Sequence, residues 1–281
     1  MNRLIPVLCF IYSASLGVSA LAAETAPPSN APAPPAEPDA ASLIARSIQA
    51  HGGWEAYQKL GDMRVEYRFY NPAVDPNAFP TRTATLKLGQ ATQVRIDYLR
   101  GTEPASMGFD GTAAWMTFNG ALADESGAFA QAEFSTKTAA WILRLPFVLH
   151  GGSYTATREG SAPRAGGPGS WDKVRVQYPD AWQVLYLNHD TGLLERAEWV
   201  IPEIGNRTEL ADFEVIEGAG PLRMFTKLTL RESDGKGAVA SDGAMTLKIL
   251  KREFSVGSTD ATYRAPQPGP AATGPHAQSP R

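Results

Sequence analysis

The chain has 281 residues and a formal net charge of −3, which is enough for one large domain or two small ones. This charge balance excludes nucleic acid as a partner, because neutralising phosphates requires a basic face. The only cysteine is Cys9, so disulfides, thiolate nucleophiles and cysteine-bound metals are excluded from the rest of the chain.

The first residues have the pattern of a secretory signal peptide. Arg3 precedes an apolar run over residues 4–18, and Ala20-Leu21-Ala22 has the form of a cleavage site. The apolar run is shorter than the ~20 residues of a membrane span. We therefore expect a signal peptide over residues 1–22, a periplasmic protein and no transmembrane span in the mature chain.

Proline-rich segments stand on both sides of the remaining sequence. Residues 23–38 are expected to form a linker, and residues 264–281 a tail of the same kind, because such compositions cannot pack a core. The folded domain is therefore expected to span residues 39–263.

The domain opens with a helical pattern. Asp39 is a suitable N-cap for a helix over residues 40–50, and Gly52-Gly53 would end it. A second short helix is expected over residues 54–60.

After the helices the period of apolar residues changes to two, which is typical of strands. Asp110-Gly111 and Asn119-Gly120 are strong hairpin signals, so we expect an antiparallel meander. Its expected strands span residues 63–69, 83–88, 93–98, 105–110, 113–118, 121–124, 154–158, 171–178, 182–187, 194–201, 209–216, 223–232 and 244–254.

A helical unit interrupts the meander over residues 131–149, and Pro146 is expected to kink or split it. Long antiparallel sheets curl, and helices cover the open side. The predicted fold class is α+β, mainly β: a curved, unclosed antiparallel barrel of about eleven strands with an N-terminal helix and an inserted helical lid.

The triplet His-Gly-Gly occurs at residues 51–53 and again at residues 150–152. It is similar to the oxyanion loop of lipases, but the chain has no Gly-x-Ser-x-Gly nucleophile motif. The simpler interpretation is that each glycine pair ends a helix and each histidine caps the last carbonyls of that helix.

Neither a metal site nor a cofactor is expected. His51, His150 and His189 are far apart in the sequence, and none has another His four residues on. There is no phosphate loop and no dinucleotide-binding glycine pattern. We expect no catalytic residues, although catalytic groups can converge from distant strands.

Large apolar side chains are the most informative feature of the strands and helices. They favour either an ordinary sheet core or an apolar cavity under a helical lid, and spacing alone does not separate the two. The candidate cavity residues are Trp54, Tyr57, Trp115, Trp141, Ile142, Leu145, Trp182, Tyr186 and Trp199.

Four segments resemble exported proteins grouped as outer membrane lipoprotein-sorting proteins, relatives of the carriers LolA and LolB. They are the first helices and strand (residues 41–69), "MGFDGTAAWM" (107–116), the end of the mid-chain helix at Leu145-Pro146-Phe147, and "VLYLNHDTGLLERAEW" (184–199). The resemblance implies an unclosed barrel with a helical lid that shields acyl chains or another apolar ligand.

Three functions are compatible with these features. The first is a non-catalytic carrier or binder of lipid or lipoprotein acyl chains. The second is a periplasmic regulatory or sensor domain of the same fold that binds an envelope protein. The third is a hydrolase with an unrecognised site. The expected partner is a lipid or an acylated lipoprotein, and the cargo is left open.

Overall fold

The computed structural model describes residues 37–88, 93–123, 126–164, 167–179, 181–201, 204–215, 222–233 and 244–266. All helices and strands of these ranges belong to the compact unit Pro38–Arg281. The predicted signal peptide lies outside the described residues, as do the predicted linker and tail except for residues 37, 38 and 264–266.

Two short helices begin this unit. Asp39 caps α1 (Ala40–Ala50), and its carboxylate accepts a hydrogen bond of 2.7 Å from the Ser42 N–H. The helix buries one side on the sheet. Gly52 and Gly53 have φ angles of 108° and 89°, a conformation that side chains disfavour. They therefore end α1 and turn the chain into α2 (Trp54–Gln58).

Each segment with period two forms a strand, and all strand pairs are antiparallel. The strands are β1 (Asp62–Tyr70), β2 (Arg82–Lys87), β3 (Val94–Arg100), β4 (Glu103–Phe109), β5 (Ala114–Phe118), β6 (Ala121–Leu122), β7 (Thr155–Pro163), β8 (Ser170–Gln177), β9 (Trp182–Asn188), β10 (Leu194–Ile201), β11 (Ile204–Val215), β12 (Arg223–Ser233) and β13 (Met245–Phe254). The described ranges thus hold thirteen strands, one for each of the thirteen expected segments, although the predicted fold class counted only about eleven.

The strands form one continuous sheet whose order follows the chain. The order is β6-β5-β4-β3-β2-β1-β13-β12-β11-β10-β9-β8-β7, so the first and last strands are neighbours in the middle. The two edges, β6 and β7, are consecutive along the chain but do not pair. The helix between them separates them, and the barrel is therefore unclosed.

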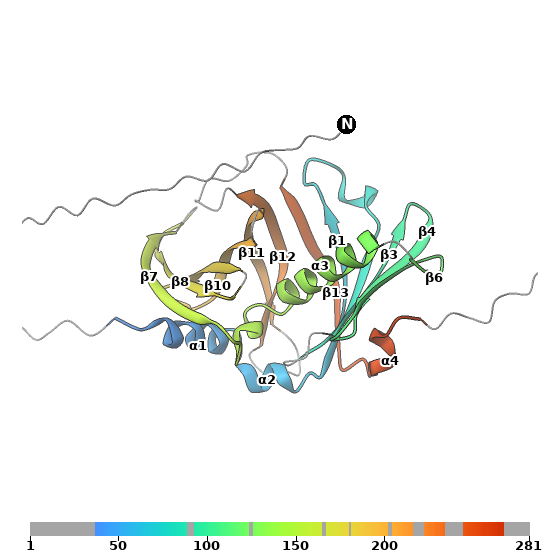
Figure 1. Ribbon diagram of the computed structural model, residues 1–281. Helices are drawn as coiled ribbons and strands as arrows, with labels where there is room; N and C mark the ends of the chain where they lie inside the picture. The colour runs from blue at the N-terminus through green and yellow to red at the C-terminus, as the bar shows by residue number, and fades with distance from the viewer. Residues whose placement is uncertain are drawn as a thin grey trace, which may run out of the picture. The chain divides into compact units, whose positions relative to one another are not determined.

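This helix is α3 (Ser126–Leu143), which is followed by the 3-10 turn η2 (Phe147–Leu149). In Figure 1, α3 crosses in front of the middle of the sheet, with β7, β8 and β10 on one side and β3, β4 and β6 on the other. The predicted helical unit over residues 131–149 is present but begins earlier. Pro146 lies between its two parts, because proline cannot continue an α-helix.

Two shorter helical segments complete the fold. The 3-10 turn η1 (Pro76–Ala78) lies between β1 and β2, and the short helix α4 (Asp260–Tyr263) follows β13. The Trp115 indole on β5 donates a hydrogen bond of 2.7 Å to the Tyr263 carbonyl. This bond joins α4 to the N-terminal half of the sheet.

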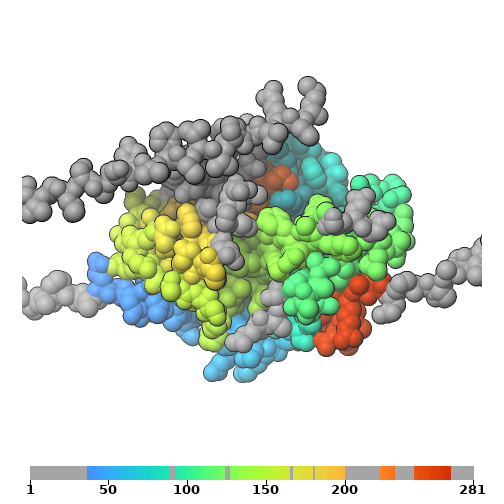
Figure 2. Space-filling model, in the orientation of Figure 1, coloured from blue at the N-terminus to red at the C-terminus, as the bar shows by residue number. Residues whose placement is uncertain are grey.

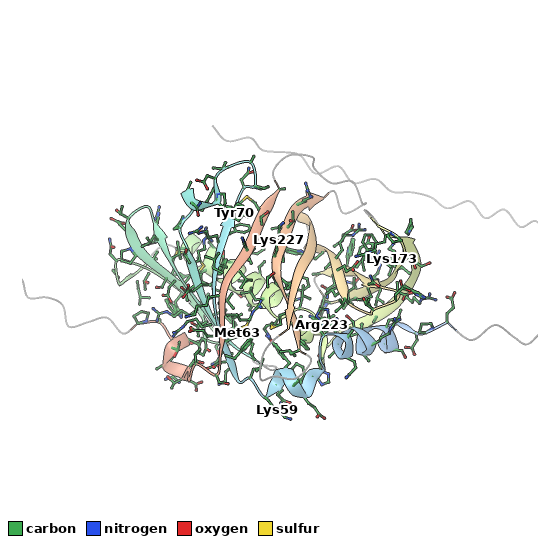
Figure 3. The ribbon with its side chains drawn as sticks, turned by 180° about the vertical axis from the view of Figure 1, so that it is seen from behind. Lys59, Met63, Tyr70, Lys173, Arg223 and Lys227 are labelled. Atoms are coloured by element: carbon green, nitrogen blue, oxygen red, sulfur yellow. The ribbon has the colours of Figure 1, made fainter. Side chains whose placement is uncertain are left out.

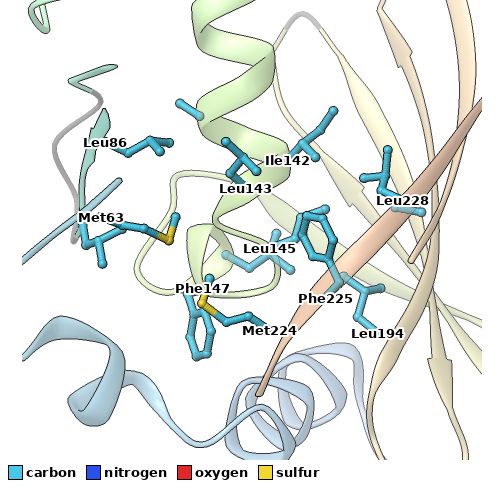
Figure 4. Close-up of a cluster of buried hydrophobic side chains, with 14 of the residues drawn as sticks. Met63, Leu86, Ile142, Leu143, Leu145, Phe147, Leu194, Met224, Phe225 and Leu228 are labelled. Carbon is cyan, nitrogen blue, oxygen red and sulfur yellow. The ribbon is translucent and has the colours of Figure 1, made fainter. Parts of the chain in front are cut away.

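The main core lies between the sheet and its helices. Leu145 and Phe147, from the segment that follows α3, are 1% and 0% exposed. Figure 4 shows them beside Met224 and Phe225 of β12, with Met63 of β1 nearby. The segment after α3 thus packs into the centre of the sheet and anchors one end of the helix.

Candidate functional site: an apolar pocket beside helix α3

Helix α3 has two opposite faces, since residues three, four or seven apart share a side of an α-helix. One face is fully buried and consists of Ala132, Thr136, Ala140 and Leu143. The helix packs against β3, β4 and β5. The other face consists of Phe134, Lys137, Thr138 and Trp141, and borders a pocket with β9 and β10. Thus α3 packs on one wall of the curved sheet, and a pocket lies between its other face and the opposite wall.

The pocket between α3 and the second wall has a volume of about 360 Å³. The strands and the turn before β9 supply Tyr178, Ala181, Trp182, Gln183 and Trp199 to its lining. Ligand sites commonly measure ~300–1,000 Å³. The lining surface is almost entirely apolar. At the rim, Phe134 is 46% exposed. In Figure 2, two surfaces lie on the same face of the molecule: the yellow surface of the strands before residue 200 and the green surface that includes α3.

Three tryptophans form much of the wall. The rings of Trp141 on α3 and Trp199 on β10 have centroids 5.9 Å apart at 49°, a distance typical of favourable aromatic pairs. The Arg175 guanidinium lies 4.3 Å from the centre of the Trp182 ring, a cation–π contact. The first contact joins α3 to β10 at the pocket, whereas Trp182 also packs against the aromatic side chains of Trp171 and Tyr186.

One buried polar group belongs to this wall. Gln183 is 1% exposed, and its Nε2 donates a hydrogen bond of 2.8 Å to the Tyr178 hydroxyl. Burial raises the pKa of Tyr178 to about 12, with a further contribution from Tyr154 and an opposing one from the Trp141 side chain. The Tyr178 hydroxyl is therefore neutral at physiological pH.

The structure brings together three of the candidate residues chosen from the sequence, namely Trp141, Trp182 and Trp199. The others lie elsewhere. Tyr57, Ile142 and Leu145 are members of the main core. Trp54 packs against that core from a partly buried position, and Trp115 contacts α4.

Tyr186 belongs to a separate aromatic cluster with Trp171 and Val184. Its ring is at 76° to that of Trp171, and the Arg196 guanidinium lies 3.6 Å from its centre. Leu185 and Leu187 are in the main core instead. Successive side chains of a strand alternate between its faces, so Tyr186 lies on the opposite face of β9 from the main core.

Several pocket residues are absent from the sequence-based candidates: Phe134, Lys137, Thr138, Tyr178, Ala181 and Gln183. The spacing of residues 134, 137, 138 and 141 is the signal that could have found the helical ones. For Gln183 there was no such signal, because an isolated glutamine on a strand is usually exposed.

Two arginines, one buried and one partly buried, were also missed. Arg144 is 4% exposed. The Arg252 guanidinium donates a hydrogen bond of 2.8 Å to the Phe225 carbonyl. Burial raises the pKa of Tyr57 to about 12, and Arg144 and Arg252 oppose that increase. Burial also lowers the pKa of Arg252 to about 10. These groups join α2, the end of α3 and β13 deep in the core.

The first His-Gly-Gly triplet is an anchor between distant segments. The His51 Nε2 accepts a hydrogen bond of 3.2 Å from the Leu194 N–H, and its Nδ1 lies 3.0 Å from the Arg223 carbonyl. The expectation that the ring caps the carbonyls of its own helix is therefore wrong, because strand ends lie closer to the ring. Figure 3 labels Arg223 at the end of β12 that lies next to α1 and α2.

The second triplet contacts Trp54, the residue that follows the first triplet. The exposed His150 ring stacks on Trp54 with centroids 4.3 Å apart at 17°, and the η2 turn ends at His150. Both imidazoles thus have structural contacts. The His51 ring is 2% exposed with both nitrogens engaged, so it is unsuited to act as a catalytic base.

Over the described ranges, no group of three or more His, Cys, Asp or Glu side chains lies close enough together to hold a metal ion. Within the same part of the chain, no helix has the length and apolar character needed to cross a membrane.

Comparisons with known proteins find similarity in structure but not in sequence. No family model matches the chain, and no curated protein sequence matches it. An outer membrane lipoprotein-sorting protein domain from Vibrio parahaemolyticus is similar, with a TM-score of 0.51 and 9% identity over 79% of this chain and 94% of that one. A DUF1329 family protein from Desulfovibrio piger has a TM-score of 0.52 and 13% identity over 80% of this chain and 97% of that one.

A LolA superfamily protein from Nitrosomonas europaea has a TM-score of 0.49 and 12% identity over 81% of this chain and 98% of that one. The protein shares the fold class of the lipoprotein-sorting domain and the DUF1329 protein: a mainly β, unclosed antiparallel sheet with a few helices. The predicted resemblance to outer membrane lipoprotein-sorting proteins is confirmed at the level of the fold.

Proposed function

We propose that this protein is an exported, non-catalytic carrier that binds the acyl chain of a lipid or lipoprotein in the pocket between α3 and β9–β10. The observation that carries the proposal is the apolar wall of that pocket, in which Trp141 and Trp199 face each other with 5.9 Å between ring centroids. The similar fold of a protein domain titled for outer membrane lipoprotein sorting supports the same class of ligand.

Burial of the chain would provide the affinity, at ~0.8 kcal/mol for each methylene group removed from water. The ligand would enter where Phe134 is exposed. One face of α3 contributes to the pocket wall and the other packs on β3–β5. A small movement of α3 would therefore open or close the site without disturbing the centre of the sheet.

Filling the pocket tests this proposal. Wild-type protein should enhance and blue-shift the emission of dansyl-undecanoic acid, because the probe leaves water. Thr138→Phe should weaken binding about tenfold or more, since Thr138 lines the pocket and the new ring occupies the site. Gln131→Phe is the matched control, because it adds the same ring to an exposed position of α3 that does not line this pocket, and it should leave binding unchanged.

Failure of folded wild-type protein to bind the probe would overturn the proposal. It would favour the alternative, a regulatory or sensor domain that binds an envelope protein. Equal binding by wild type and Thr138→Phe would show that the probe binds elsewhere.

A further inference from the structure

Gln183 is an unusual residue for the wall of an apolar pocket. It is the second residue of β9 and lies in register with Trp199 of β10 and Val176 of β8, so two large apolar side chains flank it. Its Nε2 is bonded to Tyr178, whereas its Oε1 is buried and has no hydrogen-bond partner in the structure. Only one of the two polar atoms of this amide therefore has a hydrogen-bond partner.

A buried carbonyl oxygen without a hydrogen bond is costly, and most such groups in proteins have a partner. The orientation of an amide is assigned from its contacts. The Tyr178 hydroxyl can accept from the amide nitrogen or donate to the amide oxygen. In either orientation one amide atom lacks a partner, and a ligand group that can both donate and accept would satisfy that atom in both cases.

The charges of the lining residues indicate whether this polar group of the ligand is charged or neutral. Lys137 is the charged residue among them; its side chain is 48% exposed and its ammonium pairs with Glu133 on the same helix. The ammonium also lies 4.8 Å from the centre of the Phe109 ring. The buried end, with Gln183 and Tyr178, offers only neutral groups. A buried anion needs a cation or several donors, so a neutral group fits this end better.

We propose that Gln183 and Tyr178 together bind the polar end of the ligand, and that this ligand is an apolar chain bearing a neutral group that both donates and accepts, as a hydroxyl does. The ligand hydroxyl donates to the Gln183 oxygen and accepts from Tyr178. The Gln183 oxygen is covered in the structure, so it meets the ligand only after a small rotation of the amide that keeps the bond from Nε2 to Tyr178. This inference rests on the proposed function, because it assigns the chemistry of the same pocket.

Two ligands with the same dodecyl chain distinguish binding of the apolar chain from recognition of a hydroxyl group. Dodecanol donates and accepts, whereas dodecyl methyl ether only accepts. Titration followed by tryptophan emission reports binding, since Trp141, Trp182 and Trp199 line the pocket. Wild type should bind dodecanol about threefold to tenfold more tightly than the ether, the range expected for one hydrogen bond.

In Gln183→Met this preference should fall to less than about twofold, while the ether binds as it does to wild type and so shows that the pocket is intact. Gln183→Leu repeats the test with a different apolar side chain. Gln58→Met, which removes an exposed amide on α2 outside the pocket, is the matched control and should keep the preference.

Equal binding of both ligands to wild type would overturn this inference and leave the proposed function standing. A preference that survives in Gln183→Met would also overturn it, because another group would then recognise the hydroxyl. Failure of both ligands to bind folded wild type would overturn the proposed function and this inference with it.

Discussion

At the scale of single residues, His51 shows how one buried ring can join segments that are far apart in the sequence. Its Nε2 accepts from the start of β10, and the Arg223 N–H donates to the His51 carbonyl over 2.8 Å at the start of β12. An imidazole nitrogen accepts a hydrogen bond only when it carries no proton. The fold therefore depends on a neutral His51 that donates from Nδ1.

This dependence predicts a loss of stability in mild acid. Desolvation lowers the pKa of His51 from 6.5 to about 4, so between these values the unfolded chain binds a proton that the folded chain does not. The free energy of unfolding should therefore fall as the pH drops from about 7 to 4. The contribution of His51 is about 3 kcal/mol. Urea denaturation at a series of pH values measures this change.

The variant His51→Gln lacks the titrating ring, so its deficit relative to wild type should be largest at pH 7 and should shrink towards pH 4. His150→Gln is the matched control, because it changes the same position of the second triplet at an exposed ring. It should keep the decline with pH seen in wild type. A deficit of His51→Gln that does not vary with pH would contradict the predicted role of the ring.

At the scale of elements, the sequence was most informative where side chains alternate. Asp110-Gly111 and Asn119-Gly120 mark turns that flank β5, because these dipeptides favour the backbone of tight hairpins. The start of α3 was less predictable. Its first turn contains Ser126 and Gly127, which are weak helix formers, so the sequence placed the start of the helix too late.

The candidate site was less predictable than the fold, for a physical reason. Period two assigns Tyr186 and Leu187 to opposite faces of β9, but it does not say which face meets α3. A tryptophan buried against α4, such as Trp115, has the same local pattern as Trp199 in the pocket. Distinguishing them requires knowing how the sheet curves around α3, and that is set by contacts between distant strands.

The position of α3 leads to a prediction about its dynamics. The helix is packed on β3–β5, whereas its opposite face borders the pocket, so it gains packing when a ligand fills the space. Amide hydrogen exchange of α3 should therefore slow several-fold when dansyl-undecanoic acid binds. Amides of β1 and β13, paired in the middle of the sheet, serve as the internal control. Bound probe with unchanged exchange of α3 would contradict a mobile helix.

At the scale of the whole molecule, the open sheet explains why a pocket can exist at all. The edges β6 and β7 do not pair because α3 connects them, and the helix enters the space that a closed barrel of this size would enclose. Its small residues Ala132 and Ala140 are 0% and 1% exposed and allow close approach to one wall. The bulky Trp141 lies towards the other wall, where space is left for a ligand.

The limits of the folding unit provide the last prediction. The buried apolar residues of the described ranges extend from Ala40 to Tyr263, so a chain of residues 38–266 should unfold at the same urea concentration as the full chain. A chain of residues 38–258 lacks α4 and loses Tyr263, which is 0% exposed, together with the acceptor of the Trp115 hydrogen bond. It should lose about 3 kcal/mol or more, the usual cost of removing a buried aromatic side chain. Equal stability of the two shortened chains would show that α4 does not stabilise the fold and that the sheet alone buries Trp115.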